Sequence, residues 1–326
     1  MDIQELVELS VKHNVSDLHL CSGRAPRWRR DGRLEPAELD APTPEHLLRA
    51  WLTTGQQQAL QKQHQLDFAH QLPDGRRLRA SAFANLNGLS LALRILPTAC
   101  PRFIDLSLPP ALEPLLEAQS GLILVTGATG SGKSTTLAAM VDTLNHRLPG
   151  HIITLEDPVE FVHTSARSLI QQREIGLHCS SFADGLRGAL RQDPDVILLG
   201  ELRDGETIRL ALTAAETGHL VLATLHTRTA ASAIERLADV FPGAEKDLLR
   251  SQLAGSLCAV LAQKLATGKQ GGRIALYELL INTPAVANLI REGKSHQLPG
   301  VMQTGQQAGM QTFTQSHQQR VSAGLL

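Results

Sequence analysis

The chain has 326 residues, 42% of them hydrophobic, and its 31 lysines and arginines nearly balance its 32 aspartates and glutamates. Such a length predicts two domains with ample apolar residues to bury. The net charge of −1 argues against a protein whose main task is to coat nucleic acid or a strongly acidic membrane.

Cysteine usage and the absence of a long apolar stretch favour a cytosolic location. No stretch approaches the roughly 18 apolar residues of a membrane span, and the N-terminus is acidic. We therefore expect contact with a membrane only through partners. The cysteines contain no C-x-x-C pair, so their spacing indicates neither a zinc site nor a disulfide framework. They are Cys21, Cys100, Cys179 and Cys258.

The first hundred residues predict a small α+β domain. In chain order, the predicted elements are a helix with Ile3, Leu6, Val7 and Val11 on one face, a strand at 16–20, a hairpin turn at Asp31-Gly32, and strands at 65–71, 77–84 and 89–96. The short turns between the last three strands predict an antiparallel meander. Prolines then interrupt the pattern. We expect a domain over residues 1–98 and a linker over 99–114.

Beyond the linker, strands alternate with helices, which is typical of an α/β domain with a mostly parallel sheet. The predicted strands are 122–126, 151–155, 196–199 and 220–224, and the predicted helices are 133–146, 182–191, 204–217 and 229–240. From about Glu245 the chain is predicted to be mainly helical, except for a strand-like run at 274–281. The second domain is expected to span residues 115–326.

A phosphate-binding pattern, G-x-x-x-x-G-K-[ST], directly follows the first apolar strand of this second domain. Its glycines let backbone N–H groups turn toward phosphates, its lysine neutralises the β- and γ-phosphates, and its hydroxyl binds Mg²⁺. The helix that follows directs its N-terminal dipole at the same phosphates. We predict a site for ATP and Mg²⁺, with Ser134 as a Mg²⁺ ligand, formed by Gly127, Ala128, Thr129, Gly130, Ser131, Gly132, Lys133, Ser134 and Thr135.

Two glutamates follow predicted strands of the same sheet and are candidate catalytic residues. Glu201 follows strand 196–199, where the acid of a phosphate-loop ATPase holds Mg²⁺ and orients the attacking water. A solvated glutamate at a strand end is the alternative. Glu156 follows strand 151–155, at the carboxyl edge where open α/β sheets bind ligands, and is a candidate general base. The alternative there is a simple capped turn.

Two histidines, His219 and His226, bracket the predicted strand 220–224. An imidazole can bond phosphate oxygens or a carboxylate, so both are candidate catalytic sensors of the γ-phosphate. A structural role is the alternative, and metal ligation is disfavoured because no third ligand lies at a suitable spacing.

Arginines are the remaining candidates for stabilising developing phosphoryl charge, and Arg79 and Arg94 lie on predicted strands of the first domain. A second basic group surrounds Trp28 and keeps nucleic-acid contact open as an alternative to an exposed hairpin with basic edges. It comprises Arg24, Arg27, Arg29, Arg30 and Arg33.

Four motifs in this order resemble those of the secretion ATPase superfamily, and most closely those of the type IV pilus retraction ATPases. They are the phosphate loop, an aspartate box at 153–161, a Walker B element at 200–204 and a histidine box at 217–227. The segment AVANLIRE at 285–292 is similar to the A-I-R-N-L-I-R-E signature of the retraction branch and differs at Val286 and Ala287. The assembly branch generally carries a tetracysteine motif, which is missing here.

The resemblance implies a PAS-like N-terminal domain, a RecA-like ATPase domain and a Mg²⁺-dependent ATPase that acts as a homo-hexamer. Nucleotide would lie between the two domains and a neighbouring subunit, with Arg79 and Arg94 as contacts from the first domain. The implied partner is the inner-membrane platform protein of a pilus, which places the protein at the cytoplasmic face of that membrane, and no nucleic acid is expected. A pilus assembly or type II secretion ATPase, a nucleic-acid translocase and a non-enzymatic nucleotide-binding protein remain alternatives.

Overall fold

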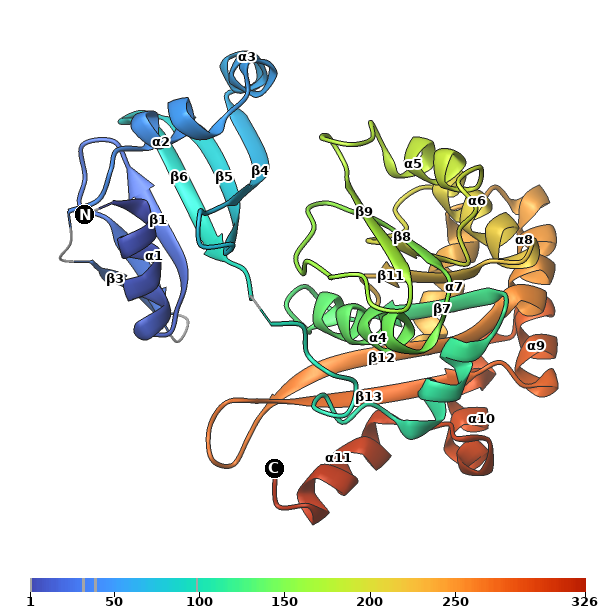
Figure 1. Cartoon of the computed structure of the whole chain (residues 1–326). Coiled ribbons are helices and arrows are strands. Elements are labelled where there is room, and N and C mark those ends of the chain that lie inside the picture. The colour runs from blue at the N-terminus through green and yellow to red at the C-terminus, as the bar shows by residue number, and fades with distance from the viewer. Residues whose placement is uncertain (1, 31–32, 38–39, 98) are drawn as a thin grey trace. The chain divides into compact units, whose positions relative to one another are not determined.

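Two compact units make up the chain, one of Met1–Ala99 with Glu160–Val162 and one of Cys100–Val159 with His163–Leu326 (Figure 1). The structure, a computed structural model, describes residues 2–30, 33–37, 40–97 and 99–326, so the predicted turn at Asp31-Gly32 lies outside the described residues. Within those ranges no helix is both long enough and apolar enough to cross a membrane.

The first unit contains an antiparallel sheet in the order β3-β2-β1-β6-β5-β4. Its elements are α1 (Ile3–Lys12), β1 (Val15–Cys21), β2 (Arg27–Arg30), β3 (Arg33–Pro36), α2 (Pro44–Trp51), α3 (Thr54–Gln63), β4 (Gln65–Gln71), β5 (Arg77–Asn85) and β6 (Gly88–Ile95). Strands β4, β5 and β6 form the predicted meander. Helix α1 buries Leu6 and Val7 as expected, whereas Val11 is 44% exposed and the buried position beside it belongs to Ser10.

Helices α2 and α3 were not predicted. The short helix α2 does present an apolar face, with Pro44, Leu47 and Leu48 buried, whereas α3 presents none. Helix α3 buries Leu60 alone among its own residues, and most of the others are polar. Thr43 and Thr53 begin the two helices by accepting hydrogen bonds from backbone N–H groups of the first turn. Capping therefore marks the start of both helices, and for α3 it is a stronger signal than periodicity.

The second unit is built on a sheet in the order β13-β12-β7-β11-β10-β8-β9, in which every neighbouring pair except β12 and β13 is parallel. Its strands are β7 (Gly121–Thr126), β8 (His151–Glu156), β9 (Leu169–Glu174), β10 (Val196–Leu199), β11 (Leu220–Leu225), β12 (Leu257–Thr267) and β13 (Arg273–Ile281). All residues of β7, β10 and β11 are buried. Continuous apolar runs are typical of parallel strands that are covered on both faces.

Helices cover the two faces of this sheet and bury two cores. They are η1 (Pro110–Glu117), α4 (Lys133–Arg147), α5 (Phe182–Ala189), α6 (Gly205–Glu216), α7 (Ala230–Asp239), α8 (Gly243–Ser256), α9 (Pro284–Arg291), η2 (Ser295–Gln297), α10 (Leu298–Thr304), η3 (Gly305–Ala308) and α11 (Phe313–Ser322). Leu122 and Leu124 of β7 pack with α6 to α9 on one face, while Ile123 and Val125 pack with α4 and η1 on the other. This alternation follows from the two-residue period of a strand.

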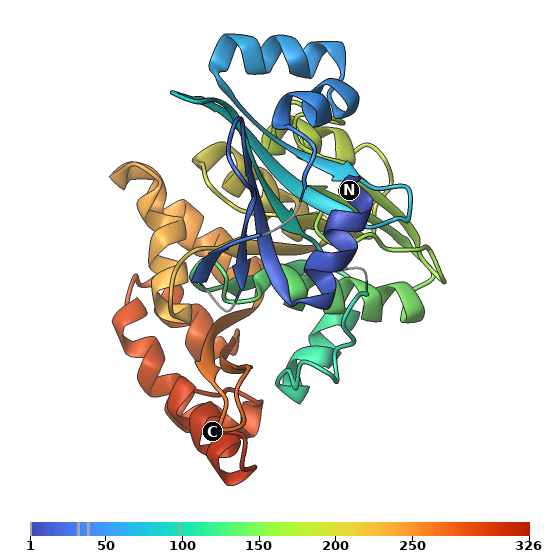
Figure 2. The same cartoon turned by 90° about the vertical axis from the view of Figure 1, so that its left-hand side faces the viewer.

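The C-terminal helices, red in Figure 2, lie beside the β12–β13 pair. Ser316 of α11 accepts a hydrogen bond from the backbone N–H of Tyr277 in β13, over 3.1 Å. The region predicted as a linker, 99–114, enters the second unit at Cys100, and Leu108 and Leu112 are buried in its core. The exact domain boundaries stay a prediction.

Strand β12 corrects the prediction that the chain is mainly helical from about Glu245. Helix α8 does extend to Ser256, but residues 257–267 are extended between β7 and β13. Alanine, leucine, glutamine and lysine in this segment favour helix locally. Pairing on both sides with neighbouring strands outweighs that local preference, because propensity is a weak determinant beside tertiary packing.

Candidate nucleotide-binding site

The phosphate loop lies between the end of β7 at Thr126 and the start of α4 at Lys133. Gly127, Gly130 and Gly132 have φ angles of +154°, +77° and +91°, a region that favours glycine. A Cβ atom at Gly127 would lie 2.4 Å from the carbonyl oxygen of Gln263. The backbone conformation therefore requires the glycines of the motif, and residues 128–130 at the tip of the loop are exposed.

The Lys133 side chain curls back over this loop. Its Nζ atom donates hydrogen bonds to the carbonyl oxygens of Gly127, over 2.7 Å, and Ala128, over 3.2 Å. Ser134 is exposed in the first turn of α4, and Thr135 beside it is half-buried. These residues thus place an ammonium group and a hydroxyl at the same end of the helix, where the helix dipole also favours anions.

A series of hydrogen bonds joins Lys133 to Glu201 through His226. Lys133 Nζ lies 3.5 Å from His226 Nδ1, and His226 Nε2 lies 2.9 Å from Glu201 Oε2. An ammonium group can only donate, so Nδ1 accepts, and the neutral imidazole carries its proton on Nε2 and donates it to the carboxylate. Arg203 forms an ion pair with the other oxygen of Glu201. Three separate loops therefore converge at the carboxyl edge of the parallel sheet.

Glu156 lies at the same edge, at the end of β8. Its Oε1 atom accepts hydrogen bonds from Thr154 Oγ1, over 2.7 Å, and from Gln172 Nε2, over 3.2 Å. The backbone N–H of Gly200, which follows β10, donates a hydrogen bond to the carbonyl oxygen of Leu155 in β8. This bond joins the carboxyl ends of the two strands. The carboxylate of Glu156 is thus held in a fixed orientation near the strand that leads to Glu201.

His219 lies at the opposite edge of the sheet from His226, and its predicted catalytic role stays a prediction. It precedes β11, its Nδ1 atom donates to the carbonyl of Ala214 over 3.1 Å, and its own carbonyl accepts from the N–H of Gly121, where β7 begins. The six residues of β11 separate its two ends by about 20 Å at the usual rise per residue. Only His226 of the pair reaches the phosphate loop of its own chain.

Arg79 and Arg94 face each other in the first unit, as paired residues of β5 and β6. Arg94 Nε donates to Asp17 Oδ1 over 2.8 Å. Their predicted contact with nucleotide stays a prediction. In the basic group around Trp28, Arg30 forms an ion pair with Glu35 over 2.7 Å. One positive charge of this group is therefore paired within the sheet.

Gln263 of β12 is a site residue that sequence analysis missed. Its side chain is 2% exposed, its Nε2 atom donates to the carbonyl of Ser131 over 2.7 Å, and its Oε1 atom accepts from Thr136 Oγ1 over 2.8 Å. It thereby ties the phosphate loop and α4 to the neighbouring strand. A polar residue within an apolar run is the signal that could have indicated it, but the segment was predicted as helix.

We expect Gln263→Glu to weaken ATP binding by about tenfold, because it removes the donor to Ser131 and places a carboxylate against a carbonyl oxygen. The acceptor for Thr136 is kept. Binding of a fluorescent nucleotide analogue measures the affinity, and steady-state kinetics show whether KM rises more than kcat falls. Gln319→Glu, on the exposed surface of α11, is the matched control. Parent-like affinity of Gln263→Glu would show that the loop does not depend on this clamp.

The chain is similar to known proteins in sequence and in fold. A family model described as Type II/IV secretion system protein matches residues 68–326. The chain is 67% identical to the uncharacterized protein YggR of Escherichia coli (strain K12), over 100% of both chains. It is 45% identical to the type IV pilus retractation ATPase PilT of Pseudomonas aeruginosa, over 100% of this chain and 96% of that one.

A solved structure of the pilus retraction motor PilT with bound ADP superposes with a TM-score of 0.91 at 41% identity, covering 100% of this chain and 94% of that one. The predicted α/β fold class and the predicted resemblance to retraction ATPases are thereby confirmed. The chain therefore belongs to the Type II/IV secretion system protein family.

Proposed function

We propose that this protein is a Mg²⁺-dependent ATPase that drives retraction of a type IV pilus. The observation that carries the proposal is the hydrogen-bonded series from Lys133 through His226 to Glu201. It links the lysine of the phosphate-binding motif to Glu201, the acid for which a role toward Mg²⁺ or water is proposed. Similarity to PilT over nearly the whole of both chains supports the specific direction of work.

The side chains present suit a nucleotide with Mg²⁺. Ser134 and Glu201 offer the oxygen ligands that Mg²⁺ prefers, and the exposed tip of the loop at 128–130 is where backbone N–H groups would meet the phosphates. Bound Mg²⁺ supplies neutralisation of the β- and γ-phosphate charges. Lys133, now on two carbonyl oxygens, would exchange them for phosphate oxygens when nucleotide binds.

The remaining residues act on water and on the lysine. Glu156, oriented by Thr154 and Gln172, serves as the general base that accepts a proton from the attacking water. His226 senses the γ-phosphate, because movement of Lys133 onto phosphate removes the partner of Nδ1 while Nε2 still bonds Glu201. A change in the contacts of Lys133 with the phosphates is therefore transmitted to Glu201 through the imidazole of His226.

The family resemblance supports a proposal for the assembly and the partner of this protein. We propose a hexameric ring in which Arg79 and Arg94 contact nucleotide, so that hydrolysis alters the angle between domains and performs work. The pilus inner-membrane platform protein receives that work, at the cytoplasmic face of the inner membrane. Similarity to PilT is the support for each of these statements.

Helix α9 carries the segment that resembles the retraction signature. Ala287, where that signature has arginine, is 8% exposed and packs in the same core as Val286 and Ile290. The difference from the signature thus lies against the core, where a small apolar side chain fits and an arginine would have to extend past its neighbours to reach water. Whether the protein retracts or extends pili is tested in cells.

Chromosomal deletion of the gene is expected to abolish twitching while surface pili remain, because pili then assemble without being withdrawn. Microscopy of colony edges and counts of surface pili measure the two effects. Complementation with the parent gene restores twitching, and complementation with Lys133→Ala does not. Normal twitching in the deletion strain would contradict a retraction role, and loss of surface pili would instead indicate an assembly ATPase.

A further inference from the structure

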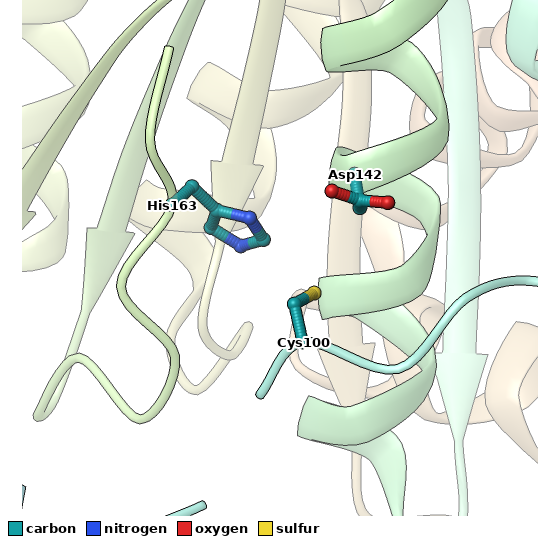
Figure 3. A group of neighbouring side chains, drawn as sticks. All are labelled: Cys100, Asp142 and His163. Carbon is teal, nitrogen blue, oxygen red and sulfur yellow. The ribbon is translucent and has the colours of Figure 1, made fainter. Parts of the chain in front are cut away.

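Three side chains from distant parts of the sequence meet beside α4, away from the phosphate loop. Cys100 lies where the chain enters the second unit, Asp142 lies on α4, and His163 lies in the segment between β8 and β9. The sulfur, a carboxylate oxygen and an imidazole nitrogen all lie within 4.8 Å of one another. Figure 3 shows His163 and Cys100 directed toward the helix that carries Asp142.

We propose that Cys100, Asp142 and His163 bind a divalent transition-metal ion of the Zn²⁺ class, with water in the fourth position. Thiolate, imidazole and carboxylate are the protein ligands that Zn²⁺ takes, and three of them with a water complete a tetrahedral site. The proposal concerns a second site, independent of the nucleotide site and of the proposed motor function.

The distances suit such a site after small side-chain movements. Zn²⁺ lies about 2.0 to 2.3 Å from its ligands, so tetrahedral ligand atoms are about 3.3 to 3.8 Å apart. Atoms that already lie within 4.8 Å of each other reach this spacing by contracting about 1 Å. All three side chains are half-buried, which allows rotation and access of an ion.

Each of the three residues has a further polar contact. The Cys100 sulfur lies 3.4 Å from the carbonyl oxygen of Ala138, one turn before Asp142 on α4. His146 Nδ1 lies 3.5 Å from Asp142 Oδ1, and the backbone N–H of His163 donates to Gln172 Oε1 over 2.8 Å. The contact of the Cys100 thiol ends when a metal displaces its proton, whereas the contacts of Asp142 and of the His163 backbone can remain.

The protonation states are compatible with a cation in the middle. Burial lowers the pKa of His163, so its imidazole is neutral and retains a lone pair for a metal. Burial, aided by the negative charge of Asp142, raises the pKa of Cys100 to about 12, so the thiol is protonated without a metal. Metal binding therefore displaces that proton, as it does at other thiolate sites.

A metal ion at this site would link two segments to α4. One is the segment that begins the second unit at Cys100, and the other is the segment between β8 and β9 that carries His163. That helix carries Lys133 and Ser134 at its first turn, and the β8–β9 segment follows Glu156. The ion would thus stiffen the scaffold behind the nucleotide site without touching the nucleotide.

Cobalt titration of the full chain, stripped of metal with a chelator and free of nucleotide, tests this site. Co²⁺ bound by a cysteine thiolate gives a ligand-to-metal absorption band that the all-oxygen ligands of a Mg²⁺ site cannot produce. We expect this band to saturate at one equivalent and to be abolished by added Zn²⁺. Cys100→Ser should eliminate it, and His163→Gln and Asp142→Asn should weaken Co²⁺ affinity at least about tenfold.

Matched variants separate this site from other cysteines and histidines. Cys258→Ser removes another half-buried free cysteine, and His296→Gln removes an exposed histidine, so both should keep the band and the stoichiometry. Circular dichroism establishes that each variant is folded. A parent protein without the band, or a folded Cys100→Ser variant that retains it, would overturn the proposal.

Discussion

Lys133→Ala is expected to lower ATP turnover by at least about a hundredfold, comparable with removing one preorganised donor to a developing anion. Lys133 is placed for this role by the carbonyl oxygens of Gly127 and Ala128 and by His226. Alanine removes the positive charge and also leaves His226 Nδ1 without its donor. A phosphate-release assay on the purified variant measures turnover.

The matched control is Lys269→Ala, which removes an exposed lysine from the turn between β12 and β13. It should hydrolyse ATP at the parent rate. Turnover of Lys133→Ala at that same rate would refute the assignment of the nucleotide site, provided that circular dichroism shows both variants to be folded.

Glu201→Gln is expected to reduce kcat by about a hundredfold to a thousandfold while ATP affinity changes only a few-fold. Glutamine keeps the size of the side chain and an oxygen that can accept from His226 Nε2. It loses the negative charge that suits Mg²⁺ and the ion pair with Arg203. The loss should therefore fall on the chemical step and not on binding.

Steady-state kinetics and nucleotide binding together distinguish this outcome from a structural one. Glu113→Gln is the control, because Glu113 also pairs with an arginine, Arg147, but lies on η1 away from the phosphate loop. It should leave kcat unchanged. An unchanged kcat in Glu201→Gln would exclude its catalytic role, and an equal loss of ATP affinity would indicate that it mainly supports the loop.

Local patterns were sufficient for much of the fold. The apolar runs of β7, β8, β10 and β11 and the periodic helices that follow them lie where they were predicted. Strand β9 and helix α3 were not predicted because most of their positions are polar, and the short helix α2 was missed despite its buried apolar face. Strand β12 was misassigned because its residues favour helix until β7 and β13 pair with it.

The sequence by itself determined the phosphate loop and the edge of the sheet at which the two candidate acids lie. A glycine loop needs its residues adjacent in the chain, and an acid at the end of a parallel strand reaches the ligand edge wherever that strand lies. Glu156 and Glu201 therefore follow from local pattern and fold class alone.

Only the tertiary structure decided which further side chains join them. His219 and His226 look equivalent in the chain, but the length of β11 puts them at opposite edges of the sheet. Gln263 and the group of Cys100, Asp142 and His163 depend on which strands and loops become neighbours. Spacing along the chain carries no direct record of such neighbours, because chain segments far apart in sequence meet only when the sheet and its helices pack.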